Sequence, residues 1–199
     1  MDDWEEDANP WTVKGVARTF ENAWFAVDGY DVIQPGGGAS VYSVVRPRRL
    51  AVGVLPLDAE GYVHLVGQWR FPLGRYSWEM PEGGAEPGEA ALDCAERELQ
   101  EETGLAAASL APILEMDLSN SLTDERAIIF LATGLRQGRA APEPVEILRR
   151  RRAHFRDVLE RVAEGRIRDS LTVAAVLRAH HMAVTGALPA SLADAMLKP

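Results

Sequence analysis

Residues 83–105 read GGAEPGEAALDCAERELQEETGL and place three carboxylates close together near the end of a predicted helix. Glu101 and Glu102 follow Glu98 by three and four residues, so a helix would place all three carboxylates on one face. Like charges at this spacing destabilise a helix by about 0.2–0.5 kcal/mol per pair. They also lie in the last turn, where the negative end of the helix dipole opposes them. The pattern therefore predicts a compensating cation, and carboxylate oxygens favour Mg²⁺, or Mn²⁺ in its place, over zinc.

The same stretch fits the pattern G-x5-E-x7-R-E-L-x-E-E-x-G-L. Its fixed positions are Gly83, Glu89, Arg97, Glu98, Leu99, Glu101, Glu102, Gly104 and Leu105. Nine fixed positions over 23 residues are too many for a chance match. At these residues the chain resembles the Nudix hydrolases, and the resemblance covers about residues 39–170. Gln68-Trp69-Arg70 and Trp78-Glu79, upstream of the box, resemble the ADP-ribose and nucleoside-diphosphate-sugar branch of that family.

The hydrophobic pattern predicts strands on both sides of one long helix, which is typical of an α/β fold. That helix is expected from near Pro87 to Gly104, with the glycine as a left-handed cap. Two more helices are expected at Leu148–Ala163 and Ser170–Ala183, and a hairpin at Ala17–Ile33 that turns at Asp28-Gly29. The other expected strands are Val41–Val45, Leu50–Leu57, Tyr62–Trp69, Arg75–Met80, Ile113–Leu118 and Ala127–Thr133. The family resemblance implies an α/β/α sandwich around a mixed sheet.

The Pro35–Gly38 break predicts two parts: residues 1–38, a tail and β-hairpin, and residues 39–199, the hydrolase domain with its C-terminal helices. The net charge of -9 argues against nucleic acid as a partner. No apolar run is long enough for a membrane span, and the acidic first residues do not resemble a signal peptide, so we expect a cytoplasmic protein. The single cysteine, Cys94, excludes an intrachain disulfide.

The resemblance implies roles for the box residues. Glu98 and Glu102 are implied as metal ligands, with Glu101 assisting, and the carbonyl oxygen of Gly83 is implied as a further ligand. Arg97 lies about a quarter-turn from the carboxylates, so we expect it to orient them.

The general base is expected outside the box. The branch implies an acidic stretch before the C-terminal helices, which here contains Glu143 and Glu146. Either is a candidate for base or extra metal ligand. Glu146 is favoured, because the apolar pair Ile147-Leu148 after it would anchor it.

Substrate contacts are implied at three places. Arg70 is predicted to clamp a phosphate and Glu79 to accept a hydrogen bond from a sugar hydroxyl. Asp124 and Glu125 lie in a serine-led acidic loop typical of the branch; the alternative is a turn that leads into a strand, with Asp124 capping the backbone. Trp24 is a candidate to stack on adenine, against the alternative of packing in a dimer core.

The run Arg149–Arg152 departs from the branch, where acidic or mixed sequence is usual. A solvated helix start and a phosphate-binding role are both open interpretations of it.

The resulting prediction is Mg²⁺-dependent hydrolysis of ADP-ribose to AMP and ribose 5-phosphate. A GDP- or UDP-sugar, or another nucleotide diphosphate, is the alternative substrate. A non-catalytic ADP-ribose-binding regulator is disfavoured by the intact box, and an isomerase by the helical position of Cys94. The resemblance and the hairpin predict a homodimer built through residues 16–34.

Overall fold

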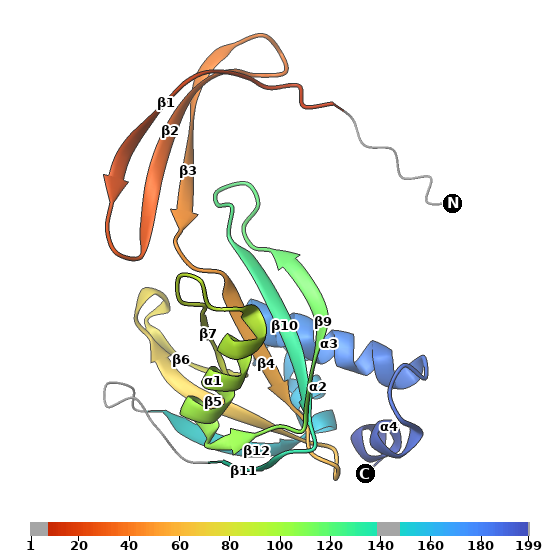
Figure 1. Ribbon diagram of the computed structural model, residues 1–199. Coiled ribbons are helices and arrows are strands. Elements are labelled where there is room, and N and C mark those ends of the chain that lie inside the picture. Colours follow the sequence, from red (N-terminus) through yellow and green to blue (C-terminus); the bar gives the residue numbers. More distant parts are fainter. Residues whose placement is uncertain (1–7, 139–147, 199) are drawn as a thin grey trace. The chain divides into compact units, whose positions relative to one another are not determined.

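The computed structural model describes residues 8–138 and 148–198 (Figure 1). The chain divides into two compact units. The first comprises Met1–Arg48 and Asp117–Glu125, and the second Arg49–Met116 and Arg126–Pro199. The boundary predicted after residue 38 lies ten residues before the one between these units, and a dimerising role for the first part stays a prediction.

The first unit is a three-stranded antiparallel sheet of order β1-β2-β3, formed by β1 (Thr12–Glu21), β2 (Phe25–Ile33) and β3 (Ala39–Pro47). The predicted hairpin is confirmed, but its predicted turn is wrong. Asp28 and Gly29 lie in the middle of β2. The turn forms at Asn22 instead, because its side-chain oxygen accepts hydrogen bonds from the backbone N–H groups of Trp24 and Phe25, both at 2.8 Å.

Asp28 is buried in this sheet between two arginines. Arg18 Nε donates to Asp28 Oδ1 at 2.8 Å, and Arg46 Nε donates to Oδ2 at 3.1 Å. The hydrogen bond from Arg18 is the main reason that the pKa of Asp28 lies below its ordinary value. The Asp-Gly pair therefore anchors the middle of a strand through charge pairing.

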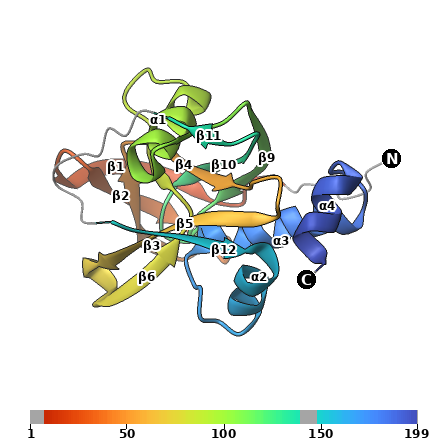
Figure 2. The ribbon, with the colours of Figure 1, turned by 90° about the horizontal axis from the view of Figure 1, so that it is seen from below.

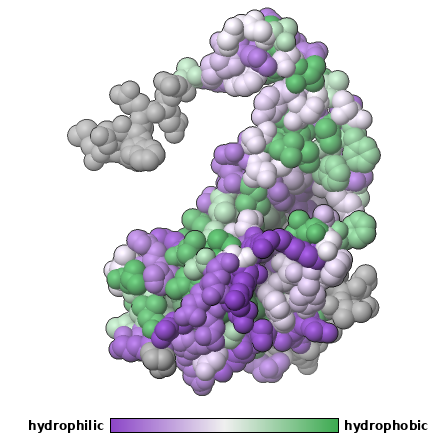
Figure 3. All heavy atoms as spheres, turned by 180° about the vertical axis from the view of Figure 1, so that it is seen from behind, coloured by the Kyte–Doolittle hydropathy of each residue, from purple (hydrophilic) through white to green (hydrophobic). Residues whose placement is uncertain are grey.

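Large apolar side chains of the first unit remain exposed, and hydrophobic residues are visible on the surface of this unit in Figure 3. The exposed side chains are Trp11, Val13, Val16, Phe20, Trp24 and Val41. They lie on both faces of the sheet, because Val16 pairs with Tyr30 and Phe20 with Val27, which point to opposite faces of β2. Exposed apolar side chains of this kind are typical of a surface that packs against a partner.

The described residues of the second unit form three sheets. A four-stranded sheet has the order β7-β4-β10-β9, in which β10 runs parallel to β4 and β7 antiparallel to it. A three-stranded antiparallel sheet has the order β12-β5-β6, and β11 pairs with β8. The strands are β4 (Ala51–Pro56), β5 (Tyr62–Arg70), β6 (Arg75–Glu79), β7 (Glu82–Gly84), β8 (Leu105–Ala106), β9 (Ser109–Asp117), β10 (Arg126–Thr133), β11 (Arg136–Gln137) and β12 (Arg149–His154).

Helices cover both faces of these sheets. Figure 2 shows α1 (Ala91–Thr103) on one side and α2 (Phe155–Ala163) with α3 (Ser170–Val184) on the other. The predicted α/β/α sandwich around a mixed sheet is confirmed. Under α1 the core is closely packed and apolar; its buried members are Val52, Val54, Ala85, Cys94, Ala95, Leu99, Phe130 and Ala132. This packing fixes the helix that carries the box carboxylates.

Helix α1 begins later than predicted and ends where predicted. Glu86 to Glu89 form a turn, with Gly88 at φ 86°, so the helix starts at Ala91 instead of near Pro87. Gly104 adopts φ 75° and its N–H donates to the carbonyl oxygen of Gln100 at 2.8 Å, which confirms the left-handed cap.

The last turn of α1 is tied to two segments that flank residues 139–147. On one side, the N–H of Gly138 donates to the carbonyl oxygen of Gly104 at 2.8 Å. On the other, Arg150 Nε donates to the carbonyl oxygen of Glu102 at 2.6 Å. A guanidinium at this position complements the negative end of the helix dipole, which offsets part of the cost of the carboxylates there.

The predicted helix Leu148–Ala163 is wrong in its first half. Arg149–His154 form β12, which pairs along its whole length with β5, and α2 begins only at Phe155. Helix α3 confirms the last predicted helix, and α4 (Ala190–Leu197) was not predicted. None of the helices in the described ranges has both the length and the apolar character needed to cross a membrane.

Gly61 connects the β4–β5 turn to α4. It adopts φ 81°, and a Cβ there would overlap the backbone of Ala195. We predict that Gly61→Ala lowers the free energy of unfolding by about 2–4 kcal/mol, from the left-handed conformation and the overlap together.

Urea denaturation measures this effect, and Gly165→Ala is the matched control. Gly165 has φ 68°, but a Cβ at this position would have no atom within 4 Å, so it reports the backbone strain alone, about 1–2 kcal/mol. Equal losses in the two variants would show that the contact with α4 contributes nothing.

Candidate functional site

The start of β7, the end of β5 and the strand β6 meet at a cavity of about 210 Å³ that several charged side chains line. Arg70, Glu79 and Glu82 line it, together with Arg168 and Asp169 from the segment before α3. The side chains of Arg70 and Glu79 reach the same face because β5 and β6 pair antiparallel, Val66 facing Glu79 and Arg70 facing Arg75.

Arg70 is held by two carboxylates. Its Nε lies 3.0 Å from both oxygens of Glu79, and its Nη2 lies 2.6 Å from Glu79 Oε2 and 2.8 Å from Glu82 Oε1. Burial lowers the pKa of Arg70, but the hydrogen bonds and charge of Glu79 outweigh it and raise that pKa above its ordinary value. Nη1 makes no hydrogen bond to the described residues, so this nitrogen is available to an anion.

Glu79 is only 2% exposed, and the partners that its carboxylate has here are Arg70 and Gln68. It therefore positions Arg70. The predicted contact of Glu79 with a sugar hydroxyl stays a prediction.

Glu82 is a site residue that the sequence analysis missed. Its backbone N–H donates to Glu102 Oε2 at 3.1 Å, and its side chain pairs with Arg70. Its second oxygen, Oε2, is the one buried side-chain oxygen or nitrogen atom without a hydrogen-bond partner in the described part of the chain. Burial, followed by the charges of Asp169 and Glu79, raises the pKa of Glu82 well above its ordinary value.

Gly83 allows the box carboxylate and the loop backbone to approach each other. A Cβ at Gly83 would overlap the carboxylate of Glu98, so any other residue at this position would displace that carboxylate. Glu98 and Glu102 are themselves buried on α1, with residue exposures of 9% and 5%. The helix and the glycine loop therefore form one cradle of oxygen atoms.

Arg97 contacts the carboxylates that it was predicted to orient. Its Nη1 lies 2.7 Å from Glu98 Oε1 and 3.0 Å from Glu101 Oε2. Its Nε and Nη2 each lie 2.9 Å from an oxygen of Glu89. These hydrogen bonds, and one from the backbone N–H of Glu86, lower the pKa of Glu89 to about 2. Glu89 is thus part of the support for Arg97.

The site fits a hard divalent cation by its donor chemistry. Within residues 8–138 and 148–198, no three His, Cys, Asp or Glu side chains already converge as a complete ligand set. The site nevertheless offers the cradle at Gly83, the buried carboxylates of Glu98 and Glu102, and the unpartnered oxygen of Glu82. Oxygen donors of this kind, in a region where neighbouring negative charges raise the pKa of Glu82, match Mg²⁺ or Mn²⁺.

Three other predicted site residues, Trp24, Asp124 and Glu125, belong to the first compact unit. Trp24 is 68% exposed, and Asp124 forms an ion pair with Arg46. The N–H of Glu125 donates to Thr123 Oγ1 at 2.7 Å, so in the turn before β10 Thr123 accepts this backbone hydrogen bond, and not Asp124 as the alternative supposed. Their substrate contacts stay predictions.

Both candidates for the general base, Glu143 and Glu146, lie outside the described residues. Their role also stays a prediction.

Cys94 is buried on α1, and burial, followed by the charge of Glu98, raises the pKa of its thiol to about 12. Because the thiolate is the reactive form, we predict almost no reaction of native protein with a thiol reagent such as Ellman's at pH 8. The same protein in denaturant should release one thiol equivalent per chain. Rapid labelling of the native protein would contradict this prediction and restore a reactive cysteine as a candidate nucleophile.

The comparisons with known proteins agree with this geometry. A family model described as the NUDIX domain matches residues 47–172. The ADP-ribose pyrophosphatase of Mycobacterium tuberculosis is 34% identical over 173 residues, which is 85% of this chain and 83% of that protein. The ADP-ribose pyrophosphatase of Bacillus subtilis is 36% identical over 141 residues, which is 71% of this chain and 70% of that protein.

Among solved structures, the crystal structure of an ADP compounds hydrolase superposes with a TM-score of 0.81. It covers 92% of this chain and 100% of that chain at 20% identity, so the likeness concerns the fold. Because the family model matches more than half of the chain, and two relatives share its sequence over most of their length, the chain belongs to the Nudix hydrolase family.

Proposed function

We propose that this protein hydrolyses the diphosphate linkage of ADP-ribose, with Mg²⁺ as cofactor and Mn²⁺ able to replace it. The observation that carries the proposal is the intact box: its Glu98 carboxylate lies against Gly83, and its Glu102 accepts the backbone N–H of Glu82, whose side chain holds Arg70. The names of the two relatives, at 34% and 36% identity, support ADP-ribose as the substrate. The more general conclusion, that the protein is a Nudix pyrophosphatase, follows from the family and the box together.

In the proposed reaction, water attacks one phosphorus atom of the diphosphate. The oxygen of water joins that phosphorus, the bridging oxygen leaves with the other phosphate, and one proton passes to a base. ADP-ribose and water thus give AMP and ribose 5-phosphate. A bound divalent cation neutralises the phosphate oxygens and lowers the pKa of water. Glu98, Glu101 and Glu102, with the carbonyl oxygen of Gly83, would hold it.

The protein's own groups position the substrate around that centre. Arg70 offers Nη1 to a phosphate oxygen while Glu79 and Glu82 fix the rest of its guanidinium. Arg97 orients Glu98 and Glu101. Glu146, or Glu143, is proposed to take the proton from water. Trp24, Asp124 and Glu125 are proposed to contact the nucleotide or the sugar.

A substrate panel tests this function. Purified protein with Mg²⁺ is offered ADP-ribose, GDP-mannose, UDP-glucose, NADH and 8-oxo-dGTP, and products are separated by ion-exchange chromatography. We expect the highest kcat/KM for ADP-ribose, with AMP as a product. A preference for GDP-mannose or UDP-glucose would move the substrate to the alternative. Binding of ADP-ribose without turnover would favour the regulator.

We also propose a homodimer built through residues 16–34, because the first unit exposes large apolar side chains. Light scattering of the full-length chain should give twice the chain mass of 21.8 kDa. The paired substitutions Val16→Asp and Phe20→Asp should shift it to the monomer, because they place one charge on each face of the sheet and so oppose burial of either face. A monomeric mass for the unmodified chain would refute the proposal. The expected cytoplasmic location stays a prediction.

A further inference from the structure

The run Arg149–Arg152 lies on the strand β12, and its side chains have different surroundings. Arg150 binds carbonyl oxygens at the end of α1, and Arg152 binds Asp58 and Glu60 at 2.7 and 2.6 Å. Arg151 instead lies over the ring of Trp78, with its guanidinium carbon 5.4 Å from the ring centre. The side chain of Arg151 has no hydrogen bond or ion pair within the described ranges.

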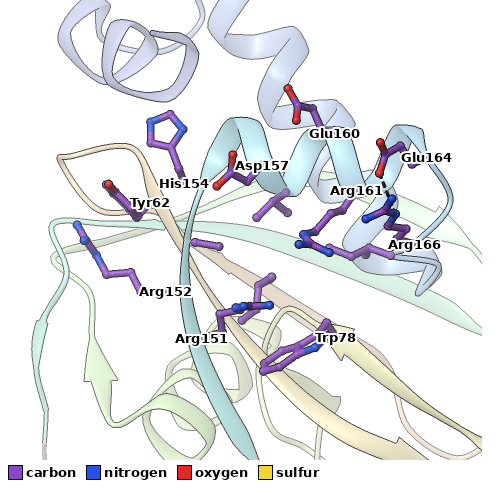
Figure 4. A pocket seen from close by; sticks show the side chains of 14 residues that line it. Tyr62, Trp78, Arg151, Arg152, His154, Asp157, Glu160, Arg161, Glu164 and Arg166 are labelled. Atoms are coloured by element: carbon purple, nitrogen blue, oxygen red, sulfur yellow. Dashed lines mark ion pairs between the residues drawn. The ribbon is translucent and has the colours of Figure 1, made fainter. Parts of the chain in front are cut away.

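Arg151 and Trp78 line a cavity of about 440 Å³ on the side of the sheet covered by α2 (Figure 4). Its floor is apolar, because the buried side chains of Leu65, Val158 and Ile167 form it. The volume lies within the range of about 300–1,000 Å³ that is usual for small-ligand sites. An apolar floor beside one indole ring offers a place for a flat ring.

A second arginine of this cavity, Arg161 on α2, also has no ion pair to a described residue. The other charges of the lining are mostly matched. Arg166 pairs with Glu164 at 3.0 Å, and Arg152 pairs as described. Glu160 lies 4.0 Å from Arg156, and Asp157 stands in the first turn of α2, where the helix dipole favours an anion.

We propose that this cavity is a second ligand site, which binds a mononucleotide. The phosphate lies on Arg151 and Arg161, which reach it from facing elements, and the base lies against Trp78 and the apolar floor. Guanidiniums bind phosphate through paired, charge-assisted hydrogen bonds. Two guanidiniums without carboxylate partners, above an apolar floor, are the combination that a phosphorylated aromatic molecule requires.

The site is distinct from the one beside α1. The described residues that line the two cavities do not overlap. Along the chain the two linings meet at Ile167 and Arg168, and again at Trp78, which lies between Ser77 and Glu79 of the cavity of Arg70. Trp78 reaches a different cavity because neighbouring side chains of a strand point to opposite faces. The proposal does not depend on hydrolysis of ADP-ribose, so the two can be tested separately.

Isothermal titration calorimetry of the full-length chain tests the proposal, with 5′-AMP and inorganic phosphate as probes and EDTA present. We expect AMP to bind with one site per chain and more tightly than phosphate. Arg151→Gln and Arg161→Gln should each weaken AMP binding by about tenfold or more, the usual effect of losing a hydrogen bond to a charged group. Arg156→Gln, on the same helix but outside the cavity lining, is the matched control and should bind AMP as the unmodified chain does.

Three results would overturn the proposal. The first is no binding of AMP. The second is AMP binding that Arg70→Gln abolishes while Arg151→Gln and Arg161→Gln preserve it, because the ligand would then occupy the site beside α1. The third is equal affinity for AMP and phosphate, which would show that the ring contributes nothing. Because Arg161 is exposed on a helix, Arg161→Gln should fold normally and retain its rate of ADP-ribose hydrolysis.

Discussion

Glu102→Gln is expected to lower kcat/KM for ADP-ribose by about a thousandfold or more, because charge stabilisation by a bound cation contributes several kcal/mol to such reactions. The amide oxygen of glutamine can still accept the hydrogen bond that Glu82 N–H donates to Glu102, so the fold should persist. Steady-state kinetics over a Mg²⁺ titration measures the loss.

Bound Mn²⁺, counted by electron paramagnetic resonance, gives a second measurement that does not depend on turnover. The matched control is Glu96→Gln, an exposed glutamate on the same helix, and it should leave both measurements unchanged. A loss of less than tenfold in kcat/KM, with Mn²⁺ binding retained, would show that Glu102 is not a metal ligand.

Glu146→Gln is expected to lower kcat by about 10²–10⁴, the usual contribution of a general base. In the unmodified enzyme, protonation of the base should lower kcat at acidic pH, and the variant without the Glu146 carboxylate should not show this fall. Metal binding and KM for ADP-ribose should change little, because the residue is proposed to act on water.

Glu143→Gln is the matched comparison, since both carboxylates lie in the same acidic stretch. If Glu143→Gln shows the larger loss and the altered pH profile, the base is Glu143. If each variant loses less than tenfold, the base lies elsewhere in the chain.

The fold was predictable wherever local signals decide it. The end of α1 follows from Gly104, and most strands follow from short apolar runs bounded by turns. The start of α1 was misplaced because Pro87-Gly88 serves the preceding turn, whose hydrogen bond joins Glu89 to Glu86. Pro87 as a helix start and Pro87-Gly88 as part of a turn are both local signals, and the sequence alone does not show which of them determines the structure.

The strand β12 was missed for a different reason. Four consecutive arginines carry no period of two, and Arg has a good helix propensity. Pairing with β5 decides its conformation, and its edge position in the order β12-β5-β6 allows the charged side chains. The pairing with β5 is a tertiary contact, which the local sequence of β12 does not reveal.

The turn at Asn22 was missed because Asp28-Gly29 is the stronger hairpin signal by composition.

The box residues of the candidate site could be predicted from the sequence, but the residues packed around the box could not. Glu98, Glu101, Glu102 and Arg97 come from one motif on one helix, so spacing brings them together. Glu82 was missed because its burial and its unpartnered oxygen arise from the packing of β7 against α1 and β4. No periodicity in the sequence reports such a contact.

The two attachments at the end of α1 have a consequence for how the enzyme can diversify. Gly138 and Arg150 are both hydrogen-bonded to the last turn of α1, so the chain is held at two fixed points on either side of the intervening sequence. A change of length or sequence between these two points should therefore leave α1 in place. The carboxylates of Glu98 and Glu101 keep their own support from Arg97, so such a change need not disturb the proposed metal site.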